Sequence, residues 1–463
     1  MSHVPAEPHR PALVAAAVLL GAALQLNNGF YSPPALALMV AALACAWTAL
    51  LAPRALGAIV PDRDGVVRVL LLAAVLGQVL VTARAPIGMY FARPLPWQHR
   101  GFVPGLEVVA VSAVVAAGSR SRRVRAAAGA AVIAVAALLG GLTYRGSPSP
   151  AIDVIAVHDE AFASLARGQS PYSMTFPDMY HGREGFYPPG MVVGGRVMYG
   201  FPYPPLSLAM TWPGHLLGDF RWSELAAWLV GAAATIAATR SSAVGVLAVA
   251  LWLFTPRAFF SLEQSWTEPL ALAWLGLSMF AASRRRFVLA AALLGLAAAT
   301  KQYMVLAAPL ALLLPRGSGR PWWHGPAIVA GVGALATAPA VVLDFNGFLG
   351  SVVMVQVREL LRMDALSLAV PYATFAGAPM PGAVYGPLVV AATALTAWRA
   401  PRTPAGFAAA LAVTLFTTFA VGKKAFCNYY VCVVALLAIA IALSRLDTTE
   451  RQAADAAPAT TSV

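Results

Sequence analysis

Long apolar stretches alternate with short polar connections along nearly the whole chain. Clear examples are residues 13–26, 69–81, 127–142, 327–342 and 429–443. Each is near the length that a helix needs to cross a bilayer. Because lipid cannot satisfy backbone N–H and C=O groups, such spans must be helices or the strands of a closed barrel. The stretches lack the alternating pattern of barrel strands, so the sequence predicts an all-α, polytopic transmembrane helical bundle.

Clusters of arginine between the apolar stretches predict which loops are cytoplasmic, because short cytoplasmic loops are rich in positive charge. On this rule the loop at 144–221 faces outward. Within it, residues 205–217 are short for a span and contain Pro213 and His215, so we expect an interfacial or re-entrant helix there. The count is then roughly fourteen spans. The span boundaries stay open near 205–221 and 287–315, where two short helices should flank Lys301 and Gln302.

Composition supports a membrane protein with a polar C-terminal tail. The chain is 59% hydrophobic and 11% charged, whereas an ordinary globular domain has about a quarter charged residues. The net charge of +13 does not indicate nucleic-acid binding, because the arginines lie between apolar stretches. We expect a disordered cytoplasmic tail at 446–463.

The outer loop concentrates polar and tyrosine side chains, which is typical of an ordered, ligand-facing loop. Asp153 follows the fifth span closely, at a position that suits a general base near the membrane interface. Residues 154–166 have the spacing of an amphipathic interfacial helix that ends at Gly168. The alternative is that Asp153 only caps this helix. His158 and Asp159 are cation ligands by type, but nothing in the pattern fixes their geometry, so no metal is predicted.

Further polar residues stand at the outer ends of spans, where cations run against the positive-inside trend. A phosphate carried on a lipid would balance such cations. The alternative for each residue alone is a side chain that extends to the interface. The candidates for binding lipid phosphate are Arg257, Lys301, Gln302, Lys423, Lys424, Asn428 and Tyr429.

Several ordered motifs resemble those of glycosyltransferase family 87, which comprises polyprenyl-phosphate-mannose-dependent mannosyltransferases of the GT-C type. Asp153-Val154, Leu165 and the segment Gly168-Gln169-Ser170-Pro171-Tyr172 are similar to the opening of that family. The segment from Tyr203 to Leu206 resembles its Tyr-Pro-Pro-Leu element. Gln264 to Glu268, Lys301-Gln302 and Lys423 to Tyr430 look like its later polar positions. The resemblance implies a catalytic membrane domain at 126–445, and the extra N-terminal transmembrane helices at 1–125 have no counterpart in it.

The resemblance implies a fold, a reaction and roles. The protein would transfer a sugar, mannose by family, from a polyprenyl-phosphate donor to a hydroxyl of a cell-envelope glycan or glycolipid, with inversion. Asp153 would be the general base, and no cofactor is implied. The active site would face the extracytoplasmic side of a bacterial plasma membrane. Acceptor and sugar contacts would come from His158, Asp159, Tyr172, Tyr203, Gln264 and Glu268.

Two other functions share many spans and buried cations. A transporter or flippase of a lipid-linked sugar would carry charges at the midplane and internal repeats, and the sequence shows no convincing repeat. A ligase of preassembled glycans would not predict the Tyr203-Pro204-Pro205 element. The sugar, the acceptor and the oligomeric state are left open.

Overall fold

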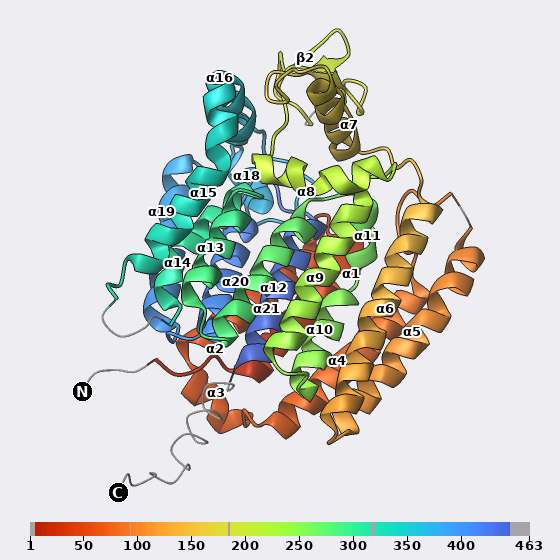
Figure 1. Ribbon diagram of the computed structural model, residues 1–463, viewed down its shortest axis with the longest axis vertical. Helices are drawn as coiled ribbons and strands as arrows, with labels where there is room; N and C mark the ends of the chain where they lie inside the picture. The colour runs from red at the N-terminus through yellow and green to blue at the C-terminus, as the bar shows by residue number, and fades with distance from the viewer. Residues whose placement is uncertain (1–4, 93, 184–185, 316–319, 445–463) are drawn as a thin grey trace, which may run out of the picture.

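The computed structural model describes residues 5–92, 94–183, 186–315 and 320–444. In these residues it is a bundle of helices with one small three-stranded sheet. Figure 1 shows the helices running side by side, with α7, β2 and α16 standing out from one end of the bundle and α3 at the other. The predicted all-α bundle is confirmed. The predicted tail at 446–463 lies outside the described residues.

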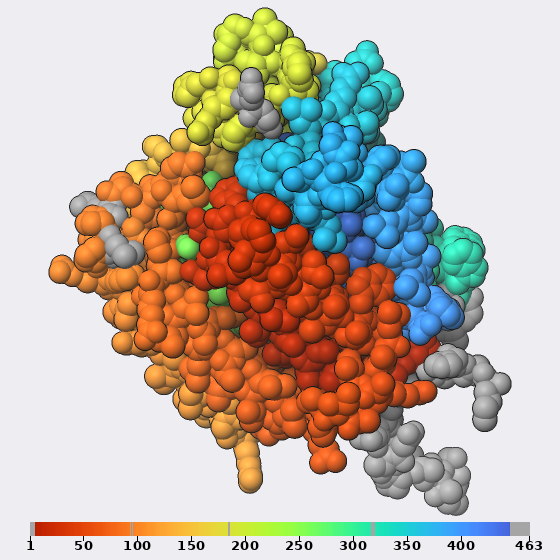
Figure 2. Space-filling view, turned by 180° about the vertical axis from the view of Figure 1, so that it is seen from behind, coloured from red at the N-terminus to blue at the C-terminus, as the bar shows by residue number. Residues whose placement is uncertain are grey.

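The N-terminal helices are part of the same bundle. They are α1 (Arg10–Asn27), α2 (Pro33–Leu51), α3 (Pro53–Ile59), α4 (Asp64–Arg84), α5 (Leu95–Gly118) and α6 (Arg122–Gly146). Helix α1 packs against α2 and α21, and α4 and α5 both pack against α10. A single hydrophobic core joins these helices to the rest of the chain, and they cover much of the face in Figure 2. The boundary between extra N-terminal helices and a catalytic domain at residue 125 therefore stays a prediction.

The segment between the bundle helices α6 and α9 forms a small unit, which we call the outer unit. It contains α7 (Asp153–Ala166), α8 (Pro205–Leu216) and the strands β1 (Phe176–Pro177), β2 (Val192–Val193) and β3 (Arg196–Val197). The strands pair antiparallel in the order β1-β3-β2. Helix α7 occupies the predicted span with one residue added at its start. It ends at Ala166, two residues before Gly168, whose φ of +69° is accessible mainly to glycine.

The remaining helices return through the bundle. They are α9 (Arg221–Ala238), α10 (Ala243–Leu253), α11 (Ala258–Glu263), α12 (Glu268–Ser283), α13 (Phe287–Ala298), the 3-10 helix η1 (Gln302–Leu306), α14 (Ala307–Leu310), the 3-10 helix η2 (Ala311–Leu313), α15 (His324–Leu343), α16 (Phe345–Phe348), the π-helix η3 (Leu349–Met354), α17 (Val355–Arg358), α18 (Ala369–Ala376), α19 (Gly382–Arg399), α20 (Pro404–Ala420) and α21 (Cys427–Leu443). Two short helical pieces flank Lys301, as predicted.

Among the described residues, six helices are long and apolar enough to cross a membrane. Five shorter apolar segments accompany them, including α10, α13, α20 and α21. The protein is therefore membrane-embedded. The expected count of roughly fourteen spans is not confirmed, since length and apolar character together qualify fewer helices.

Candidate functional site

A cavity of about 1390 Å³ opens at the end of the bundle that carries α7. Its walls come from the start of α7, the loop that follows α7, the residues around η1, the segment before α18, and the start of α21. Of the predicted site residues, the following line it: Asp153, Tyr203, Gln264, Lys301, Gln302, Lys423, Lys424, Asn428 and Tyr429. Segments far apart in the chain therefore meet in one place.

All three lysines of the chain line this cavity. The other basic side chains are arginines, so lysine occurs in this protein only where the cavity is. A lysine ammonium is a compact point charge that binds phosphate oxygens without a fixed geometry. The concentration of lysine at one site is stronger evidence for an anionic ligand than any one of these residues alone.

Asp153 lies in the first turn of α7, half-buried at the cavity wall. The helix begins at Asp153 itself, Ile152 is the N-cap residue, and no side chain makes a capping hydrogen bond. Asp153 is therefore not the N-cap residue of α7, and its role as a general base stays a prediction. Burial raises the pKa of this carboxyl above its usual range, against the lowering effects of the Lys424 ammonium and the Tyr180 hydroxyl. A raised pKa suits a group that must take up a proton.

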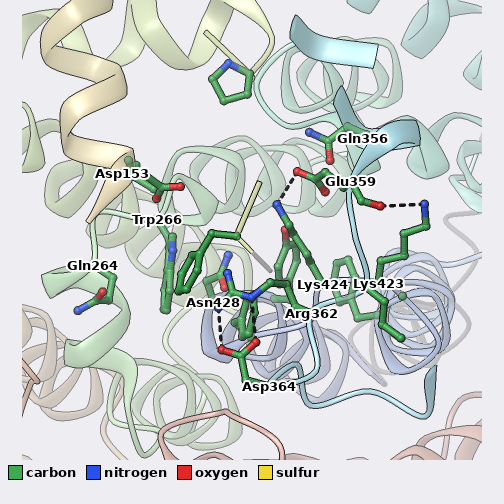
Figure 3. Close-up of a pocket in the computed structure, with 18 of the residues that line it drawn as sticks. Asp153, Gln264, Trp266, Gln356, Glu359, Arg362, Asp364, Lys423, Lys424 and Asn428 are labelled. Atoms are coloured by element: carbon green, nitrogen blue, oxygen red, sulfur yellow. Dashed lines mark hydrogen bonds and ion pairs between the residues drawn. The ribbon is translucent and has the colours of Figure 1, made fainter. Parts of the chain in front are cut away.

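The cations on the opposite wall belong to two paired segments. The Arg362 N–H donates to the Lys423 carbonyl over 3.0 Å, and the Leu366 N–H donates to the Ala425 carbonyl over 2.9 Å. Lys424 Nζ lies 2.6 Å from Glu359 Oε1, while Lys423 Nζ donates to main-chain carbonyls, including that of Glu359. Figure 3 shows this cluster on one side of the cavity, with Asp153 and Gln264 on the other.

Lys301 sits deeper and is already paired. Its Nζ lies 2.9 Å from Glu268 Oε1 and 2.8 Å from Thr267 Oγ1, and it stands 4.6 Å from the centre of the Tyr203 ring. The side chains of Lys301 and Glu268 are 6% and 2% exposed. Glu268 does not line the main cavity, so its contact is with Lys301 and with the Tyr303 hydroxyl at 3.0 Å.

Four other predicted residues lie away from the cavity lining. Tyr172 is buried, and its hydroxyl donates to the Tyr203 carbonyl at 3.4 Å. Asp159 is exposed on α7. Arg257 donates to the Pro86 carbonyl, which holds the loop between α4 and α5. The fourth residue, His158, is fully buried on α7. These placements do not support direct contacts with a ligand in this cavity.

His158 is a packing residue of the outer unit. Its ring is stacked 4.4 Å from the Phe220 ring, and Nδ1 lies 2.8 Å from the Val154 carbonyl. Burial lowers the pKa of His158 to about 4, so the ring is neutral at pH 7. A signal for this placement was present in the sequence, since position 158 falls on the same helical face as Ala161 and Phe162.

We expect His158 to make stability fall in acid. The unfolded histidine protonates below about pH 6.5 but the folded one only near pH 4, so the contribution is full above 6.5 and is lost as pH falls between these values. Between pH 7 and pH 5 the contribution of His158 to the free energy of unfolding should fall by about 2 kcal/mol. Thermal unfolding in detergent at both pH values should show a smaller fall for His158→Phe than for the parent. Equal falls would contradict the assignment.

Several residues that line the cavity lie outside the predicted set of site residues. Arg362 binds Asp364 through two parallel hydrogen bonds of 2.9 and 2.7 Å, with its guanidinium 4.0 Å from the centre of the Phe186 ring. Glu359, Tyr180 and Tyr90 also line the cavity. The signal for Arg362 was the dense run of charges at 358–364 in an otherwise apolar outer region.

No group of three or more His, Cys, Asp or Glu side chains suited to a metal ion occurs within the described residues. The expectation that the protein needs no metal stays a prediction, because substrate phosphate can itself provide metal ligands.

Within the described residues, the apolar bundle contains a polar cavity that bears a carboxylate on one wall and a cation cluster on the other, an arrangement that suits an anionic ligand in a membrane protein. The model of glycosyltransferase family 87 matches residues 201–422, just under half of the chain. This is the family that the motifs resemble, and the match indicates a glycosyltransferase. It includes Tyr203, Gln264 and Lys301, while Asp153 and Lys423 lie outside the matched residues. No curated protein matches the chain.

Proposed function

We propose that this protein transfers a sugar, mannose by family resemblance, from a polyprenyl-phosphate donor to a hydroxyl of a cell-envelope glycan or glycolipid. The reaction takes place at the extracytoplasmic side of a bacterial plasma membrane and inverts the anomeric centre. The observation that carries the proposal is the meeting of Asp153 with all three lysines of the chain in one cavity.

Asp153 acts on the acceptor. Its carboxylate takes the proton of the acceptor hydroxyl as that oxygen attacks the anomeric carbon of the donor sugar. The bond between the anomeric carbon and the phosphate oxygen breaks, and the polyprenyl phosphate leaves with the bonding electrons. Attack from the side opposite to the leaving phosphate inverts the centre. The placement of Asp153 across the cavity from the cations (Figure 3) supports this geometry.

The cation cluster acts on the leaving group. Lys423, Lys424 and Arg362 lie on segments that pair through main-chain hydrogen bonds, so their positions are fixed before the substrate binds. Preorganised positive charge stabilises the phosphate dianion that develops as the sugar leaves. Lys301, Asn428, Gln302 and Tyr429 line the same cavity and complete the proposed lipid-phosphate site. Tyr203 and Gln264 remain proposed contacts of the sugar.

The test is transfer by the purified protein. Detergent-purified protein is incubated with polyprenyl-phosphate mannose carrying labelled sugar, together with a bacterial glycolipid extract, and the label is followed into new products. Transfer without an energy source supports the enzyme. Movement of labelled lipid between the leaflets of proteoliposomes, with no new glycosidic bond, would favour the flippase instead. Joining of whole preassembled glycans would favour a ligase.

Replacing the cluster cations should weaken donor binding more than acceptor binding. Lys424→Met removes a cation and leaves the Glu359 carboxylate unpaired in the cavity, so the KM for the donor should rise about 10- to 100-fold, the value of one charge-assisted hydrogen bond. Arg362→Lys should act in the same direction, because a lysine cannot reproduce the planar fork. Steady-state kinetics with each substrate varied separately measures both.

The matched control is Arg358→Gln, because Arg358 is exposed four residues before Arg362 and does not line the cavity. It should leave both KM values unchanged. If Lys424→Met and Arg358→Gln behave alike, the cluster does not hold the donor.

A further inference from the structure

We propose that residues 85–92, in the loop between α4 and α5, form the acceptor-selecting wall of the cavity, with Tyr90 as the specificity-determining residue. The ligand it meets is the sugar ring of the acceptor, which offers hydroxyls and an apolar face. This inference rests on the proposed function. The loop lies outside the residues matched by the family model.

Met89 and Tyr90 both line the cavity. Their main-chain N–H groups donate to the two oxygens of the Glu263 carboxylate, over 2.6 and 2.9 Å. Glu263 is fully buried and immediately precedes Gln264, which lines the cavity. A buried carboxylate that binds two consecutive amides fixes the backbone of the loop at the position where its side chains reach the site.

The close seating of the loop depends on Gly88. A Cβ atom at this position would lie 2.3 Å from the Glu263 carboxylate, so either the carboxylate or the loop would have to move. Hydrogen bonds also fix the loop on either side of this contact. The Ile87 N–H donates to Gln98 Oε1 at 3.2 Å, and the Ala92 N–H donates to the Gly146 carbonyl at 2.8 Å. The main chain of the loop is therefore held in a fixed position at the wall of the cavity.

The loop stands on the acceptor side. Gln264, next to the carboxylate that holds the loop, lies with Asp153 away from Lys423 and Lys424 in Figure 3. Burial raises the pKa of Tyr90, and the negative charges of Glu263 and Asp153 add to the shift, which is consistent with a hydroxyl on the side of the proposed base. A tyrosine offers a flat ring to a sugar face and a hydroxyl to a sugar hydroxyl.

The test uses two pairs of variants of the full-length protein. Tyr90→Ala and Tyr90→Phe separate the ring from the hydroxyl. Gly88→Ala displaces the loop from Glu263, and Gly77→Ala is its control, because a Cβ at Gly77 in α4 meets nothing within 4 Å. We expect Tyr90→Ala and Gly88→Ala to raise the KM for the acceptor about tenfold or more, with the donor KM unchanged. The ranking of alternative acceptor glycans should change as well.

Gly77→Ala should behave like the parent, and Tyr90→Phe should fall between the parent and Tyr90→Ala. Tyr90→Phe keeps the ring, so it tests the inference even if the other variants fold poorly. An unchanged acceptor KM and an unchanged glycan ranking in the Tyr90 variants would overturn the inference while leaving the transferase intact. Failure of the parent to transfer any sugar would instead refute the proposed function, and this inference with it.

Discussion

Asp153→Asn should lower kcat by about 10²- to 10⁴-fold, the usual contribution of a general base. Asparagine has nearly the same shape as aspartate and still fits the first turn of α7, so the protein should fold and bind the donor. What it lacks is the ability to accept the proton of the acceptor hydroxyl. Labelled-sugar transfer at saturating donor and acceptor measures the change. Retention of full activity by this variant would remove Asp153 from the mechanism.

The pH dependence gives a second measure of the same role. Burial raises the pKa of Asp153, and the base works only when it has lost its proton. Activity of the parent should therefore rise with pH along an acidic limb that lies above the range of an ordinary aspartate. The residual activity of Asp153→Asn should lack this limb.

The control for Asp153 is Glu160→Gln on the same helix. Glu160 pairs with Arg167 and Arg196 at the surface of the outer unit and does not line the cavity. Exposed pairs of this kind contribute at most about 1 kcal/mol. Glu160→Gln removes one negative charge, as Asp153→Asn does. It should keep both the transfer rate of the parent and the acidic limb of its pH profile.

Much of the architecture could be predicted because lipid restricts the choice of structure. Apolar length identified the long helices, and the glycine after position 166 marked the end of α7. Lys301 was expected between two short helices, and it stands between α13 and η1. The number of spans could not be predicted as well. Helices such as α10 and α13 have only 11 and 12 residues, and length alone does not show whether such helices cross a membrane.

The cavity was harder to predict than the helices, because it depends on contacts between distant segments. The pattern placed His158 and Tyr172 among polar loop residues, yet both pack inside the outer unit. Conversely, Tyr90 lies in a short loop between apolar helices. Its neighbours in the sequence do not show that hydrogen bonds to Glu263 hold this loop at the cavity. Lysine was the informative residue type, since in this arginine-rich chain it was placed only at the cavity.

Lys301→Met should destabilise the protein by about 3–5 kcal/mol, because it leaves the buried Glu268 carboxylate without its partner. The two side chains are 6% and 2% exposed, so water cannot replace the ammonium. Loss of the cation from beside the Tyr203 ring adds to the effect. The decrease in thermal unfolding temperature in detergent, compared with the parent, measures the cost.

The double variant Lys301→Met with Glu268→Gln separates stability from catalysis. It carries neither the Lys301 ammonium nor the Glu268 carboxylate. The Gln side chain can still accept a hydrogen bond from the Tyr303 hydroxyl, as Glu268 does, so most of the lost stability should return. Transfer should not return, because the deepest cation of the cavity is then missing when the phosphate leaves. We expect kcat to stay about 10²- to 10³-fold below the parent, the size of a lost preorganised charge or donor. Recovery of both stability and rate would instead make Lys301 a purely structural partner of Glu268, and the leaving phosphate would then depend on Lys423, Lys424 and Arg362 alone.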